Sequence, residues 1–402
     1  MMNVLLCVGT AIILGFIGGK LIRNLKIPAV TGWVIMGVIL GGSAMGIFTE
    51  NILEKVGIVS DLALGFIAFG IGEELTVPRL KRLGKSILFI VIFEAFGAFI
   101  LVNLAVFAIT HRLYEALVLG AISSATAPAA TVMVLQEVRA KGDLTTTILS
   151  VVAIDDAIAL ILYAFASSFA KIFISPSAHL TISATFLQPS KEIFGALALG
   201  IVTGILVSLF RRWISSRTDF FIVIVAAILL NLGLSVWLGF SELLACMGLG
   251  MTVANLDPKD LRRISQTWET ATPVIYIAFF CLAGAHLNIR LLPQIGLLGL
   301  AYTGARMLGK VSGASLGARI SGAPKVVQKY IGFSLFPQVG VALALAVVVG
   351  RDFAGYGMAG KSLAVTVINI LLFTTIITEI VGPYLTKWSL VKSGESRERI
   401  NH

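Results

Sequence analysis

Two adjacent acidic residues, Asp155 and Asp156, lie near the middle of a hydrophobic run at residues 143–171. The run is long enough to cross a bilayer, where burying a carboxylate is costly. Two neighbouring carboxylates also repel each other and lose their hydration together, which favours a proton on at least one of them. Acids inside a membrane commonly mark an ion or proton path. The pair therefore predicts cation or proton binding, and a structural ion bridge is the alternative.

The preceding run, at 114–138, combines hydroxyl groups with a helix-breaking residue. Pro128 lacks a backbone N–H and clashes with the preceding turn, so it predicts a break near Thr126, in the middle of the run. Freed backbone groups are tolerated in a membrane only where they line a cavity or pack on protein. We therefore expect Thr126, with Ser124 and the freed carbonyls, to supply oxygen ligands beside Asp156 for a dehydrated Na⁺.

A matching break is predicted in the run at 325–350, where Pro337, Gln338 and Gly340 occur together. Two interrupted segments at corresponding places in two halves of a chain are typical of transporter binding sites. The alternative is that both prolines produce simple kinks.

Two basic residues, Arg306 and Lys310, lie one turn apart in the run at 291–320. Counted at a rise of ~1.5 Å per residue, Lys310 and Asp155 have similar depths in the membrane. A buried cation and a buried anion at one level need each other, which predicts an ion pair. Because neighbouring residues on a helix point about 100° apart, Asp156 would then face the cavity.

Three further acids are candidates for pH sensing or gating. Glu73 and Glu74 end an apolar run beside a basic loop, so a solvated helix end is the simpler interpretation. Glu94 lies deeper, in the run at 86–110, where it is either part of a proton entry route or a hydrogen-bonded structural acid.

The elements that must position these residues are strongly hydrophobic. The chain has 402 residues, 57% of them hydrophobic and only 13% charged, a composition that excludes an ordinary soluble protein. We predict an all-α polytopic membrane protein with about thirteen transmembrane helices. The predicted spans are 4–23, 28–47, 55–79, 86–110, 114–138, 143–171, 191–211, 218–237, 240–256, 266–288, 291–320, 325–350 and 361–388.

The net charge of +10 is distributed as a topology signal, so nucleic acid is not an expected partner. With the N-terminus outside and the C-terminus inside, 22 of the 31 Lys and Arg residues fall on the inner side and 7 on the outer side. The two interrupted runs are the fifth and the twelfth. Their offset of seven predicts two inverted repeats, formed by runs 1–6 and 8–13 and joined by the seventh.

Several of these segments together resemble the monovalent cation:proton antiporter-2 family, and within it the electrogenic bacterial sodium/proton antiporters. The resemblance covers residues 4–388, and the acid pair combined with Lys310 is its most specific part. The segments that carry it are IPAVTGWVIMGVILG, SSATAPAAT, AIDDAIA, GARMLGKVSGASLGARI and LFPQVGVALALA.

The resemblance implies a homodimer in a bacterial inner membrane, with Asp156 binding the cation and Asp155 paired with Lys310. It also implies two domains that move relative to each other. These are a dimerisation domain at 1–83 and 215–288 and an ion-transporting core at 86–172 and 291–390, with a linker helix at 190–213 and a cytoplasmic tail at 391–402. One departure from the family is Thr126, because many related exchangers carry an aspartate at or near this break.

The expected function is exchange of Na⁺ or Li⁺ for H⁺ by elevator-type alternating access, serving pH homeostasis. Competition of both ions for one carboxylate is sufficient for antiport, and two titrating groups against one cation predict electrogenic exchange. A K⁺/H⁺ antiporter is the main alternative. An organic-anion symporter is disfavoured because the acid pair repels anions. No nucleophile–base set or cofactor fingerprint is present, so neither an enzyme nor a cofactor is expected.

Overall fold

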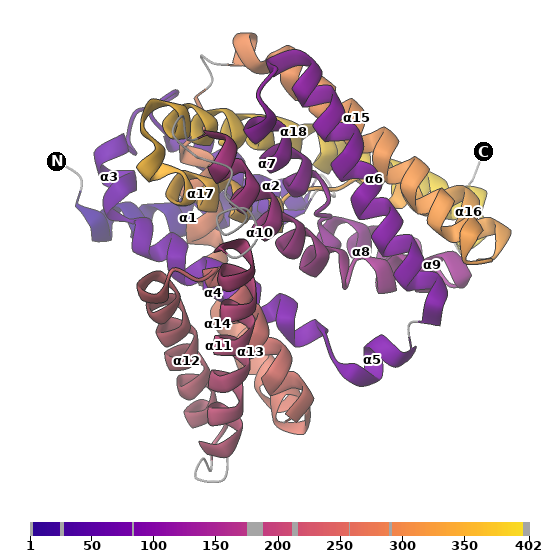
Figure 1. Cartoon of the computed structure of the whole chain (residues 1–402), viewed down its shortest axis with the longest axis horizontal. Helices are drawn as coiled ribbons and strands as arrows, with labels where there is room; N and C mark the ends of the chain where they lie inside the picture. The colour runs from indigo at the N-terminus through magenta and orange to yellow at the C-terminus, as the bar shows by residue number, and fades with distance from the viewer. Residues whose placement is uncertain are drawn as a thin grey trace.

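The computed structural model describes residues 3–24, 28–82, 84–174, 188–210, 216–256, 258–288 and 292–396. Within these ranges the chain is helical, and its one extended pairing is an isolated bridge between Gly41 and Phe48. Figure 1 shows a bundle of crossing helices. The outer loop predicted after residue 171 and the end of the predicted tail fall largely on 175–187 and 397–402, outside the described residues.

Each of the thirteen predicted runs coincides with one helix or with consecutive helical pieces. The elements of the first half are α1 (Val4–Arg23), α2 (Ala29–Leu40), α3 (Glu50–Lys55), α4 (Gly57–Glu74), α5 (Val77–Arg82), α6 (Gly84–Thr110), α7 (Leu113–Ser123), α8 (Pro128–Glu137), α9 (Asp143–Val151) and α10 (Asp155–Ile174). Those of the second half are α11 (Gln188–Phe210), α12 (Arg217–Leu238), α13 (Glu242–Leu256), α14 (Pro258–Ala285), α15 (Leu292–Ile320), α16 (Lys325–Tyr330), η4 (Ile331–Ser334), α17 (Gly340–Asp352), η5 (Ala354–Tyr356) and α18 (Gly357–Lys392).

The distribution of side chains is that of a protein surrounded by lipid. Among the described residues, six helical stretches are long and apolar enough to cross a membrane. Large apolar side chains such as Leu104 and Leu308 are exposed, whereas Arg306, Lys310 and Asp155 are fully buried. The count of thirteen crossings and the inverted repeat remain predictions.

Helices α6 and α15 lie side by side over most of their length (Figure 1). Three glycines spaced four residues apart on α15 make this approach possible. A Cβ at Gly309 would lie 2.5 Å from the carbonyl oxygen of Gly97, and Cβ atoms at Gly313 and Gly317 would meet the carbonyls of Phe93 and Phe89. Small residues at this spacing allow close helix packing in lipid, where dispersion contacts replace the hydrophobic effect. The glycines therefore fix which residues of α6 and α15 face each other.

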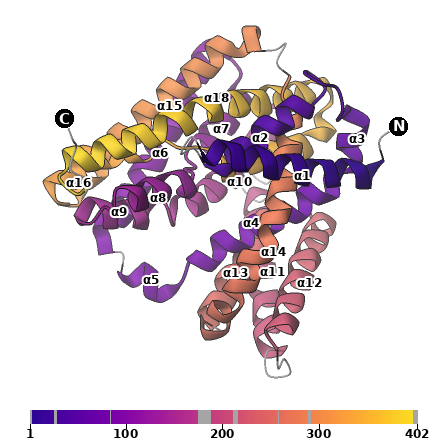
Figure 2. The same cartoon turned by 180° about the vertical axis from the view of Figure 1, so that it is seen from behind.

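A second group of helices packs in the same way. Helix α13 contacts α4 and α11, and α2 contacts α1 and α14, which Figure 2 shows from behind. Gly72 of α4 faces the backbone of Met247, and Gly250 of α13 faces that of Phe69, so glycines on both helices allow the contact. Glycines therefore allow close packing here as they do between α6 and α15.

Three helical segments are interrupted inside the bundle. Residues 124–127 separate α7 from α8, and residues 335–339 separate η4 from α17, at the two positions where proline predicts a break. The third interruption, at 152–154 between α9 and α10, corrects the expectation of one continuous helix over 143–171. Its consequence is that Asp155 and Asp156 occupy the first turn of α10, where the partial positive charge of a helix N-terminus favours anions.

Candidate functional site

The two interrupted segments meet through their backbones. The N–H of Ala127 donates to the carbonyl of Pro337 at 2.8 Å, and the hydroxyl of Thr131 donates to the carbonyl of Ser334 at 3.2 Å. Pro128 is at the start of α8, and Gly340 is the first residue of α17. The contact brings the C-terminal end of α7 next to residues 335–339, so that several carbonyl groups without helical partners face one region.

Arg306 of α15 satisfies three of these carbonyls. Its Nε donates to Ser123 at 2.9 Å, its Nη2 to Ala125 at 2.8 Å, and its Nη1 to Phe336 at 2.7 Å. The side chain is fully buried. The fork of guanidinium donors therefore joins the two interrupted segments and offsets the partial negative charge at the end of α7.

Gln338 provides a second polar link between the segments. Its Nε2 donates to the carbonyl of Ile122 at 3.0 Å, and its Oε1 accepts from the hydroxyl of Tyr302 at 3.2 Å. Its own carbonyl accepts from the hydroxyl of Thr375 on α18 at 3.1 Å. The predicted break residue is thus tied to α7, α15 and α18.

Lys310 lies one turn after Arg306 and is surrounded by oxygen atoms. Its Nζ donates to the Thr126 hydroxyl at 2.7 Å and to the carbonyl of Ser124. The expected partner, Asp155, is at 3.8 Å, whereas Glu94 Oε2 is only 2.6 Å away. The predicted ion pair between Asp155 and Lys310 is therefore present, and α6 adds a nearer carboxylate that the sequence analysis did not assign to Lys310.

The two adjacent acids differ in exposure. Asp155 is completely buried, whereas Asp156 retains 8% of its surface exposed. Among the described residues, Asp156 Oδ1 has no hydrogen-bond partner. An acid with an unused oxygen in a buried, polar crossing can bind either a proton or a small cation.

The other predicted site residues have different positions. The Ser124 hydroxyl turns back to the carbonyl of Ala121 at 2.6 Å, so Ser124 faces Lys310 with its carbonyl alone. Glu73 and Glu74 end α4, which packs against α13 and α14, so they are not gathered with Glu94. Tyr302, the partner of Gln338, is a residue of this region that the sequence analysis did not predict.

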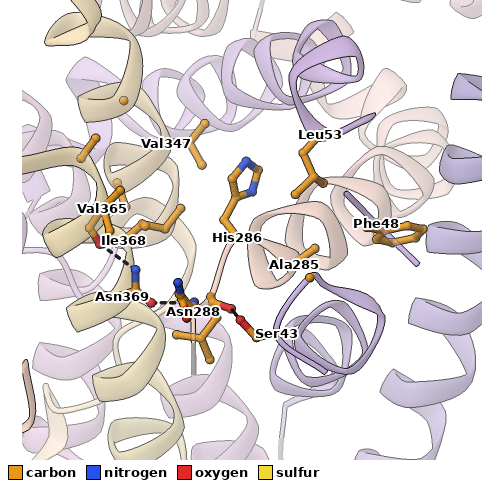
Figure 3. Close-up of a pocket in the computed structure, with 15 residues that line it drawn as sticks. Ser43, Phe48, Leu53, Ala285, His286, Asn288, Val347, Val365, Ile368 and Asn369 are labelled. Atoms are coloured by element: carbon orange, nitrogen blue, oxygen red, sulfur yellow. Dashed lines mark hydrogen bonds between the residues drawn. The ribbon is translucent and has the colours of Figure 1, made fainter. Parts of the chain in front are cut away.

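Two cavities lie elsewhere in the bundle. One of about 470 Å³ is bounded by the segments around α2, α3 and α14 on one side and by α17 and α18 on the other, and His286 points toward its interior (Figure 3). On its floor the side-chain oxygen of Asn369 accepts from the N–H of Asn288 at 2.7 Å (Figure 3).

The second cavity, of about 240 Å³, is lined by charged residues of α10, α11, α13 and α17. Arg351 at the end of α17 bridges Asp61 of α4 at 2.6 Å and Glu242 of α13 at 3.1 Å. Asp352 accepts from the Tyr163 hydroxyl at 2.9 Å. These partly exposed ion pairs contribute about 1 kcal/mol or less each, but they connect α17 to α4 and α13.

Comparison with known proteins gives one consistent result. The family described as "Sodium/hydrogen exchanger, transmembrane" matches residues 8–392. The Na(+)/H(+)-K(+) antiporter GerN of Bacillus cereus is 23% identical over 93% of this chain and 92% of its own length. The Na(+)/H(+) antiporter of Enterococcus hirae is 23% identical over 92% and 95%, respectively. The ammonium/H(+) antiporter subunit AmhT of Alkalihalophilus pseudofirmus is 24% identical over 91% of both chains.

A solved structure shows the same fold. The sodium proton antiporter MjNhaP1 from Methanocaldococcus jannaschii superposes with a TM-score of 0.77 at 20% sequence identity, covering 96% of this chain and 97% of that protein. The match extends over nearly all of both chains. With the family match over residues 8–392, it shows that this chain is an integral membrane protein of the sodium/hydrogen exchanger family, one of the monovalent cation:proton antiporters.

Proposed function

We propose that this protein exchanges Na⁺, or the smaller Li⁺, for H⁺ across a bacterial inner membrane. The observation that carries the proposal is the position of Asp155 and Asp156. They begin α10, are almost fully buried, and lie in the polar region where the two interrupted segments cross. An ordinary structural role would not need two adjacent carboxylates there.

Asp156 is the proposed ion-binding carboxylate because it keeps part of its surface exposed, whereas Asp155 is completely buried. When it is ionised it attracts a cation, and when it is protonated it does not. Because the two ions compete for one group, each releases the other, and the exchange needs no further coupling device. Thr126 is a proposed additional Na⁺ ligand, since hard cations prefer oxygen.

The proposed movement is an elevator-type displacement of a core, at 86–172 and 291–390, against a dimerisation domain at 1–83 and 215–288 in a homodimer. The packing supports this division. Helix α6 packs on α15 and α7, and α7 packs on α10, whereas α2 packs on α14, and α13 packs on α4 and α11. Helix α11, proposed as the linker, packs mainly on α13 of the dimerisation domain.

K⁺ is the second candidate cation. GerN is described as a Na(+)/H(+)-K(+) antiporter and AmhT as an ammonium/H(+) antiporter subunit, so relatives at similar identity differ in their cations. The site supplies carboxylate, hydroxyl and carbonyl oxygens, and all of these cations bind such ligands. Direct competition among Na⁺, Li⁺, K⁺ and NH₄⁺ decides between the candidates.

The test is transport by purified protein in proteoliposomes containing a pH-sensitive dye, with each cation added in turn. We expect Na⁺-dependent proton movement that Asp156→Asn abolishes while the protein still folds. Asp219→Asn, at an exposed position in the first turn of α12, is the matched control and should transport normally. Full exchange by the folded Asp156→Asn variant would contradict the assignment.

Repeating the assay with and without an imposed membrane potential tests whether exchange is electrogenic. We propose that it is, with the N-terminus outside and the C-terminus inside. A potential that is negative inside should then speed proton entry coupled to Na⁺ exit.

A further inference from the structure

A third buried carboxylate faces Lys310 from a helix that carries neither of the adjacent acids. Glu94 is in the middle of α6, is completely buried, and has its Oε2 2.6 Å from Lys310 Nζ. Asp155 Oδ2 is 3.8 Å from the same nitrogen. The shorter contact therefore gives Lys310 a carboxylate partner outside α10.

The backbone fixes this contact. The Gly313 position on α15 lies against α6, and a Cβ there would be 2.9 Å from Glu94 Cα and 2.2 Å from the carbonyl oxygen of Phe93. Gly309, next to Lys310, approaches Gly97 in the same way. Because α6 and α15 are held this closely (Figure 1), Glu94 and Lys310 remain neighbours whenever these two helices move together.

The charges near the crossing can be counted. Around Lys310 they are the acids Glu94, Asp155 and Asp156 and the bases Arg306 and Lys310, all nearly or completely buried. A further buried acid, Glu379 of α18, interacts with Arg306 and accepts from the Thr31 hydroxyl at 3.4 Å. The donors of Arg306 are directed to three backbone carbonyls, so its hydrogen bonds are not shared with the acids. With the five groups around Lys310 ionised and Glu379 unchanged through the cycle, this cluster of five groups carries one net negative charge.

We propose that Glu94 is the resident counter-ion of Lys310, so that Lys310 keeps its proton through the cycle while Asp155 and Asp156 both exchange protons. This inference rests on the proposed cation/proton exchange. One bound Na⁺ makes the cluster neutral, and two protons in its place leave one positive charge. Each cycle then exchanges two protons for one Na⁺. The site is neutral when it carries Na⁺ across the membrane, and it has one positive charge when it carries the two protons back.

The inference predicts how Glu94→Gln changes the coupling ratio. Without Glu94, Asp155 becomes the only carboxylate paired with Lys310 and stays ionised, so that Asp156 alone exchanges a proton. In proteoliposomes with the potential clamped at zero, a tenfold Na⁺ gradient should be balanced by about half a pH unit in the wild type and by about one pH unit in Glu94→Gln. A balance point is an equilibrium property, so a merely slower or less stable variant would not shift it.

Glu94→Asp, which retains a carboxylate, should keep the balance near half a unit, and the surface variant Asp219→Asn is the control. The inference would be overturned if the wild type balanced the tenfold Na⁺ gradient at a pH difference of about one unit. It would also be overturned if Glu94→Gln balanced it at the same pH difference as the wild type. Absence of any cation/proton exchange by the wild type would instead overturn the proposed function.

Glu94→Gln could fail to fold because it leaves Lys310 with a more distant partner. In that case Asp155→Asn provides the test, since Lys310 keeps Glu94 in that variant. We expect Asp155→Asn to fold, to melt within a few degrees of the wild type, and to balance at about one pH unit. A loss of stability in Asp155→Asn as large as that in Glu94→Gln would show that Asp155 is the resident counter-ion, which overturns the inference.

Discussion

Replacing Arg306 by lysine tests how the two interrupted segments are held together. Arg306 donates three hydrogen bonds from three separate nitrogens, to Ser123, Ala125 and Phe336, at 2.7–2.9 Å. Lysine keeps the positive charge but has a single nitrogen, which cannot occupy three donor positions. We expect it to leave one or two carbonyls without a partner in a completely buried place.

Each buried carbonyl left without a donor costs about 1–3 kcal/mol. We therefore expect Arg306→Lys to lower the free energy of unfolding by about 2–5 kcal/mol. The assay is SDS-induced unfolding in dodecyl maltoside micelles, followed by tryptophan fluorescence. Arg319→Lys is the matched control because Arg319 is on the same helix, is exposed, and should change stability by about 0.5 kcal/mol or less.

The reasoning would be refuted if Arg306→Lys and Arg319→Lys unfolded at the same SDS concentration. That outcome would mean that water or other donors replace the guanidinium, so the crossing does not depend on its fork. Arg306→Gln, which also removes the charge, should be at least as destabilised as Arg306→Lys.

Three further outcomes are expected. Gly313→Ala should destabilise the protein by about 1–3 kcal/mol, because the added Cβ would lie 2.2 Å from a backbone carbonyl oxygen of α6. Gly304→Ala, on the same helix, is the control: its Cβ would meet nothing within 4 Å, so its free energy of unfolding should be unchanged in the same assay. Thr126→Val removes an acceptor 2.7 Å from Lys310 and should lower apparent Na⁺ affinity about tenfold; unchanged affinity in transport titrations would limit Thr126 to a structural role. A double-mutant cycle on Asp155→Asn and Lys310→Ala should give a coupling of about 0.5–2 kcal/mol, and strict additivity would show that the 3.8 Å contact has no energetic weight.

The interruptions near Pro128 and Pro337 could be predicted from the sequence because the loss of an N–H donor is a local property of proline. The third interruption, at 152–154, could not. Its residues are Val152, Ala153 and Ile154, none of which is a helix-breaking type. The adjacent acids that follow were the one signal, since acids favour the first turn of a helix.

The partner of Lys310 could be predicted only in part. Counting residues from the ends of the two helices predicted that Asp155 and Lys310 lie at the same depth in the bilayer, and their side chains are indeed 3.8 Å apart. Which other helix lies beside α15 depends on surface fit, which residue counting does not describe. The spacing of Gly309, Gly313 and Gly317 indicates a close helix neighbour but does not identify it as α6, so Glu94 remained an isolated acid.

The hydrogen bond between the N–H of Ala127 and the carbonyl of Pro337 has a consequence for sequence variation. Every residue type has a backbone carbonyl, and every type except proline has a backbone N–H. This one contact therefore specifies almost no side chain, in contrast to the links made by Arg306 and Gln338, which require a guanidinium and an amide. A substitution at Ala127 by any residue except proline therefore keeps the donor of this hydrogen bond.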